Sequence, residues 1–143
     1  MLELNFFANF KNKLFYLWFR VVLWCTIIFC LSAIPNYRGM DPNFETLWGI
    51  LEFSARKSAH LCEYAVLFIF IYRAMEKTWE NRSQGQFLFS FCISILYALS
   101  DEIHQTFVFG RNGSSMDIFI DAVGSLIGYF FLIKIDRKLS QYT

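Results

Sequence analysis

The chain has 143 residues, which is enough for one domain with one core. Apolar residues make up 56% of the chain and charged residues only 17%. In a soluble domain about a quarter of all residues are charged, because its surface faces water. The formal net charge of +1 gives no general attraction to nucleic acid, and only two prolines and seven glycines are present, so collagen-like and disordered classes are excluded as well.

Four segments are long and apolar enough to cross a bilayer, which takes about 20 mostly apolar residues per helix. In chain order they cover residues 14–34, 57–75, 86–107 and 116–135. The sequence therefore predicts an all-α, polytopic membrane protein, a small bundle of four transmembrane helices that forms a single domain over residues 1–143. The first segment carries Arg20 and no A-x-A site follows it, so we expect a retained helix rather than a signal peptide. Ile34-Pro35-Asn36 predicts its end.

The basic residues in the short flanks predict the orientation, because cytoplasmic flanks carry more lysine and arginine. Nine lie on the side of the termini: Lys11, Lys13, Arg20, Arg73, Lys77, Arg82, Lys134, Arg137 and Lys138. Four lie on the other side: Arg38, Arg56, Lys57 and Arg111. We therefore expect both termini inside the cell and the loops 35–56 and 108–115 outside. Phe44, Trp48 and Phe53 predict a stretch of the first loop that lies at the membrane interface.

The polar residues of the last three predicted helices gather at their outer ends. They are Lys57, His60, Glu63 and Tyr64, then Asp101, Glu102, His104 and Gln105, then Asp117 and Asp121, with Arg111 and Ser114 in the last loop. Spacings of three and four place these residues on shared helix faces. Charge inside a membrane is costly and rarely faces lipid, so we expect the faces to meet in a polar chamber open to the outside. Gly124-x-x-x-Gly128 predicts the close approach of another helix.

A purely structural interpretation of these residues is also open. His60 can be a core histidine held by one carboxylate, and Arg111 can be an anchor at the headgroup level. Asp101 and Glu102 can form a solvated helix end. Co-location favours function, because apolar side chains can replace a structural ion-pair network at little cost.

At these residues the sequence resembles the VanZ-like membrane protein family. The matching pieces, in the family's order and spacing, are Ser32-Ala33-Ile34-Pro35, Lys57-x-x-His60-x-x-x-Tyr64, Asp101-Glu102-x-His104-Gln105, Gly110-Arg111-x-Gly113-Ser114 and Asp117-x-x-x-Asp121-x-x-Gly124-x-x-x-Gly128. The family more often has Asn at the position of Asp121 and Pro at that of Phe109. The resemblance implies action at the cell envelope and lowered sensitivity to the lipoglycopeptide teicoplanin, which associates the site with the outer leaflet of the plasma membrane.

Three functions of different classes follow. The first is a binding protein, in which Lys57, Tyr64, Asp101, Gln105, Arg111, Ser114, Asp117 and Asp121 hold an envelope ligand. The partners expected are a membrane lipid, a lipid-linked envelope precursor or the lipoglycopeptide itself; no nucleic acid is expected, and a homo-oligomer stays open. The second is a membrane-embedded hydrolase or transferase on a lipid-linked substrate, in which His104, His60 and Glu102 act as acid and base. The third is a small oligomeric transporter.

Imidazole and carboxylate groups at His60, His104, Asp101 or Glu102, and Asp117 are ligand types that suit zinc or manganese. The sequence contains no HExxH motif and no other known ligand spacing. It therefore predicts no metal and no cofactor.

Overall fold

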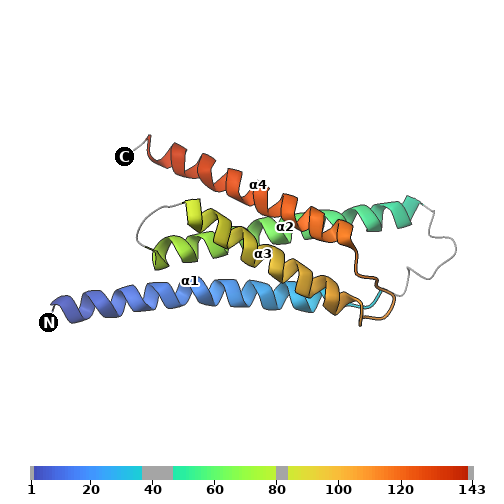
Figure 1. Cartoon of the computed structure of the whole chain (residues 1–143), viewed down its shortest axis with the longest axis horizontal. Helices are drawn as coiled ribbons and strands as arrows, with labels where there is room; N and C mark the ends of the chain where they lie inside the picture. The colour runs from blue at the N-terminus through green and yellow to red at the C-terminus, as the bar shows by residue number, and fades with distance from the viewer. Residues whose placement is uncertain (1, 37–46, 80–83, 142–143) are drawn as a thin grey trace.

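The computed structural model describes residues 2–36, 47–79 and 84–141. Within these ranges the chain forms four helices and no strands: α1 (Leu2–Ser32), α2 (Leu47–Thr78), α3 (Gln84–Gln105) and α4 (Ser115–Leu139). Figure 1 shows the helices side by side in a bundle, with the N- and C-termini at one end. We call this the terminal end. The segment between α3 and α4 lies at the opposite end, which we call the loop end.

All four helices contain a stretch long and apolar enough to span a membrane, over Lys11–Ser32, Gly49–Thr78, Gly85–Gln105 and Ser115–Leu139. Large apolar side chains cover the outside of the bundle: Phe15 is 70% exposed and Phe130 is 66% exposed. Such a surface is unfavourable in water and favourable against lipid tails. The chain is a multi-pass membrane protein, and the prediction of four transmembrane helices in an all-α bundle is confirmed.

Two helices begin earlier than predicted: α1 at Leu2 rather than residue 14, and α2 well before residue 57. This helix begins at Leu47 and includes part of the stretch that the sequence assigned to the first loop. An ion pair between Arg56 and Glu52, one turn apart at 3.0 Å, supports the added turns. Phe44 of the predicted interfacial stretch lies outside the described residues. The end of α1 agrees with the prediction, since the helix stops at Ser32 just before Pro35.

The helix α2 lies at the centre of the packing. Its side chains Tyr64, Leu67, Phe68 and Ile71 have no exposed surface, and its most extensive packing is against α4. Three side-chain hydrogen bonds attach α1 to the neighbouring helices within the described residues. The indole N–H of Trp24 donates to the carbonyl of Glu63 at 2.9 Å, that of Trp18 donates to the hydroxyl of Thr78 at 3.2 Å, and the hydroxyl of Tyr97 donates to the carbonyl of Cys25 at 2.5 Å.

Two glycines set the distance between α2 and α4. A Cβ atom at Gly124 would lie 2.3 Å from the carbonyl oxygen of Leu61, and one at Gly128 would lie 2.4 Å from that of Ala65. Any larger residue would therefore push the two helices apart, so the predicted close approach at these glycines is confirmed. The approach also brings Asp117 and Asp121 of α4 beside the first half of α2.

Candidate functional site

The polar residues of α2 and α4 meet in two pairs at the loop end. Lys57 forms an ion pair with Asp117, and one turn further His60 Nδ1 lies 3.3 Å from Asp121 Oδ1. Asp121 has no exposed surface and His60 is 9% exposed. The two pairs repeat with the helical turn, which is why their spacing along the sequence is three residues on one helix and four on the other.

The last turn of α3 adds two carboxylates, each anchored through one oxygen. Asp101 Oδ2 accepts a hydrogen bond from Gln105 Nε2 at 2.9 Å. Glu102 Oε2 accepts one from the backbone N–H of Ser114 at 2.6 Å. The other oxygens, Asp101 Oδ1 and Glu102 Oε1, are buried and find no hydrogen-bond partner among the residues that the structure describes.

We call His60, Asp101, Glu102 and Asp121 the polar cluster. One nitrogen of His60 and one oxygen each of Asp101 and Glu102 all lie within 4.8 Å of one another. Asp121 Oδ2 also has no hydrogen-bond partner within the described part of the chain, and Asp121 Oδ1 and His60 Nδ1 have none besides their own contact at 3.3 Å. Each such buried group costs about 1–3 kcal/mol of stability, which makes the polar cluster an expensive feature that packing alone does not require.

The loop 106–114 holds α3 and α4 in register. The hydroxyl of Ser114 caps α4 by accepting from the backbone N–H of Met116 at 3.2 Å. Gly110 has a φ of +73°, and a Cβ there would lie 2.1 Å from the carbonyl oxygen of Asn36. The backbone N–H of Asn36 donates to the carbonyl of Phe109 at 3.0 Å, which fixes the loop against the end of α1.

Arg111 connects this loop to α1. Its Nε donates to the carbonyl of Ile34 at 3.0 Å, and its Nη2 donates to that of Leu31 at 3.5 Å. Leu31 belongs to the last turn of α1, where its carbonyl also accepts from the backbone N–H of Ile34 at 3.3 Å, and Ile34 lies just beyond the helix, so the guanidinium caps the helix end. Burial, and then the like charge of Arg56, lower the pKa of Arg111 below its ordinary value. The sequence predicted a ligand-binding role for Arg111, and the structure adds this structural one.

Two adjoining cavities open beside the polar cluster. The larger has a volume of about 270 Å³ and is lined by Asn36, Phe53, Arg56, Lys57, His60, Gln105, Gly110, Arg111, Asn112 and Asp117. The smaller has about 200 Å³ and is lined by Leu31, Ser32, Arg56, Ala59, His60, Glu63 and Arg111. Arg56, His60 and Arg111 line both cavities. These volumes suit a headgroup-sized ligand rather than a whole lipid, because drug-sized ligands occupy about 300–1,000 Å³.

The sequence model of one protein family, described as VanZ/LLP1, matches residues 4–136. The chain belongs to the VanZ/LLP1 family. A search of curated proteins and a search of solved structures each found no match. The resemblance predicted from the sequence motifs of this VanZ/LLP1 protein is therefore confirmed over nearly the whole chain.

Two predicted site residues of the VanZ/LLP1 chain lie beside the polar cluster without joining its three-residue group. His104 is partly buried and its ring stacks on Phe29 with a centroid distance of 4.3 Å. Tyr64 is fully buried, and its hydroxyl has no hydrogen-bond partner among the described residues. Both are available to a ligand only after some rearrangement of their surroundings.

The structure also adds residues that the sequence did not assign to the site. Arg56 lies one turn before His60 on α2, so helical spacing could have found it. Asn36 lines the larger cavity only because the loop 106–114 docks on the end of α1. No local signal in the sequence predicts that contact.

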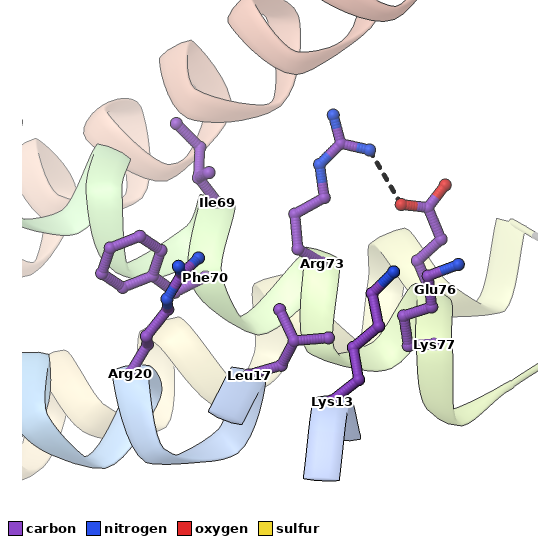
Figure 2. Close-up of a pocket in the computed structure, with 8 residues that line it drawn as sticks. All are labelled: Lys13, Leu17, Arg20, Ile69, Phe70, Arg73, Glu76 and Lys77. Carbon is purple, nitrogen blue, oxygen red and sulfur yellow. Dashed lines mark hydrogen bonds and ion pairs between the residues drawn. The ribbon is translucent and has the colours of Figure 1, made fainter. Parts of the chain in front are cut away.

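A third cavity, larger than the two beside the polar cluster, lies elsewhere, near the terminal end between α1 and α2 (Figure 2). It has a volume of about 690 Å³ and is lined by Lys13, Leu17, Arg20, Ile69, Phe70, Arg73, Glu76 and Lys77. Its central Arg73 is engaged by Glu76 at 2.8 Å and by Asp136 at 2.6 Å. None of the described buried polar atoms that lack a partner belongs to its lining. The two cavities beside the polar cluster are smaller, but His60 lines both of them, and its neighbours in the cluster carry the unpartnered buried oxygens.

Proposed function

We propose that this VanZ/LLP1 protein is an envelope protein of the bacterial plasma membrane. Its polar site faces outside, binds the headgroup of a membrane lipid or a lipid-linked envelope precursor, and lowers sensitivity to lipoglycopeptides such as teicoplanin. The observation that carries the proposal is the set of buried, unpartnered polar atoms of the polar cluster beside a headgroup-sized cavity.

The lining of the larger cavity supports a ligand with both anionic and hydrogen-bonding groups. Arg56, Lys57 and Arg111 bring positive charge to it, which favours phosphate or carboxylate. Asp117 and Gln105 line the same cavity and offer acceptors for amide or amine donors. A phosphate next to amide-bearing groups is the chemistry of lipid-linked envelope precursors.

The excess of basic residues in the flanks of the terminal end supports the outside location. Nine lysines and arginines belong to that side and four to the loop end, so the positive-inside rule orients the loop end outward. The polar cluster would then contact the outer leaflet, where lipid-linked precursors and lipoglycopeptides meet.

Antibiotic susceptibility tests the proposal. A sensitive Gram-positive host would express the wild type, His60→Gln, Glu102→Gln or the control Lys11→Gln, whose side chain is exposed on α1 far from the site. Teicoplanin would be tested beside vancomycin, with the amount of each protein in the membrane measured by immunoblot. We expect the wild type and the control to raise teicoplanin tolerance and the two site variants to have no effect. A wild type without effect refutes the resistance role, and a fully active His60→Gln variant refutes the site.

One observation favours a second function, a membrane-embedded hydrolase or transferase. Asp121 lies beside His60 Nδ1 at 3.3 Å and can orient the imidazole, the arrangement that general acid–base catalysis uses. The test is incubation of the purified protein with a lipid-linked precursor in detergent micelles. Product that forms with the wild type and not with His60→Gln would establish the enzyme; binding without product would leave the binding protein.

A further inference from the structure

We propose that His60, Asp101 and Glu102 bind a divalent metal ion of the Zn²⁺ or Mn²⁺ type at the polar cluster. The sequence predicted no metal. It did not predict this site because the three residues come from two helices and share no motif. The role of the ion in holding an anionic headgroup rests on the proposed function, whereas the binding of the ion does not.

The first argument for the metal site is the short distance between the donor atoms. One donor atom from each of the three residues lies within 4.8 Å of the other two. Donor atoms at about 2.1 Å from a tetrahedral metal ion are about 3.4 Å apart, so adjustments on the order of 1 Å would complete the coordination. Side-chain torsions of His, Asp and Glu provide movements of this size without a shift of the helices.

The second argument is the negative charge of the buried carboxylates. Asp101, Glu102 and Asp121 are nearly or fully buried, and within the described residues none of them forms an ion pair with a lysine or arginine. The nearby cations are engaged elsewhere: Lys57 pairs with Asp117, Arg56 with Glu52, and Arg111 donates to backbone carbonyls of α1. Buried carboxylates require a counter-charge or protonation, and a divalent cation is a counter-charge that fits a space too small for another side chain.

The anchoring of the ligands carries the third step. Gln105 holds one oxygen of Asp101 and the Ser114 N–H holds one oxygen of Glu102, so the other oxygen of each carboxylate is left without a partner. Asp121 Oδ1 lies 3.3 Å from Nδ1 of His60, so in the proposed site Asp121 would orient the imidazole and Nε2 would bind the ion. Outer groups that hold each ligand in this way are typical of metal sites.

Three protein ligands leave a fourth position on a tetrahedral ion, as in zinc sites that act on substrates. His60 lines the larger cavity, so this position would face the space that Lys57 and Arg111 also line. A phosphate oxygen is a suitable occupant, because the metal and the two cations would then share its negative charge.

Metal analysis of the purified protein tests the inference. The wild type, stripped with EDTA in detergent and reloaded with Zn²⁺ or Mn²⁺, is expected to retain one ion per chain by mass spectrometry of the elements. His60→Gln, Asp101→Asn and Glu102→Gln are expected to lose this ion. Glu63→Gln is the matched control, since Glu63 lines the smaller cavity but is not in the three-residue group, and it should bind as the wild type does. Asp121→Asn should keep the stoichiometry and bind about 10–100-fold more weakly.

Thermal unfolding supplies a second readout that excludes misfolded variants. The metal should raise the unfolding temperature of the wild type and of Glu63→Gln, and leave that of a folded, monodisperse Asp101→Asn unchanged. A folded wild type that retains neither ion, or site variants that bind like the wild type, would overturn the inference and indicate protonated carboxylates instead. A protein that binds the ion but gives no teicoplanin tolerance would refute the proposed function and leave the metal site standing.

Discussion

The close contact between α4 and α2 can be tested by a single methyl group at Gly124. In Gly124→Ala the new Cβ would lie 2.3 Å from the carbonyl oxygen of Leu61 and 3.1 Å from its carbonyl carbon. The neighbour is backbone rather than a flexible side chain, so the helices themselves must separate. Ordinary van der Waals contact requires this distance between Cβ and the carbonyl oxygen to be larger by about 1 Å. Overpacking of this kind lowers the free energy of unfolding by about 1–3 kcal/mol.

The same displacement should open the polar cluster. His60 Nδ1 and Asp121 Oδ1 are 3.3 Å apart across this helix pair, and a further 1 Å or so would end their interaction. We therefore expect Gly124→Ala to lower the unfolding temperature in detergent and to weaken whatever ligand or ion the cluster binds. The two effects should appear together because one contact controls both.

The control is Gly85→Ala, in the exposed first turn of α3. Alanine favours a helix over glycine there, so this variant should be neutral or slightly stabilising. Differential scanning fluorimetry of both proteins, at equal expression in the membrane, measures the difference. A Gly124→Ala protein with the unfolding temperature and binding of the wild type would refute the argument that this glycine sets the helix distance.

Three further predictions concern the ends of the bundle. Arg73→Ala should lower the free energy of unfolding by about 1 kcal/mol, a small value because the ion pairs of Arg73 are partly exposed. An unfolding temperature equal to that of the wild type would contradict this prediction. Arg111→Ala should stay in the membrane, but its free energy of unfolding should fall by about 1–3 kcal/mol, because two carbonyls at the end of α1 lose the hydrogen bonds of a charged donor. An unfolding curve in denaturant equal to that of the wild type would contradict the capping role. In a cysteine-free background, a membrane-impermeant maleimide applied to intact cells should label Asn112→Cys and spare Lys77→Cys, and the reverse pattern would invert the topology.

The sequence predicted the helices and their faces because these features are local. Apolar length defines each span, and spacings of three and four residues place Lys57 with His60 and Asp117 with Asp121. The glycine spacing on the fourth helix predicted the helix contact that joins these pairs. Each of these signals lies within one helix and is independent of the rest of the fold.

The features that the sequence did not predict depend on contacts between distant segments. Arg111 caps α1 because the loop 106–114 docks against residues more than seventy positions earlier in the chain. Gln105 donates to one oxygen of Asp101, and the backbone N–H of Ser114 donates to one oxygen of Glu102. These contacts determine which oxygen of each carboxylate is left without a hydrogen bond. The start of α2 at Leu47 was missed because the apolar residues before Arg56, among them Trp48 and Phe53, were assigned to a loop at the membrane interface rather than to the helix.

The depth of the site limits what it can accept. His60 lines the larger cavity, and one and two turns further along α2 the side chains of Tyr64 and Leu67 have no exposed surface, so the helix is closely packed beyond His60. The cavity's volume of about 270 Å³ leaves no room for an acyl chain below the polar groups. Under the proposed function, a lipid ligand would insert only its headgroup and keep its tail outside the bundle. The apolar side chains of Met116 and Phe119 on α4 are exposed near the loop end, and such a tail would lie against them. This geometry favours a ligand that approaches from the membrane with its polar end first.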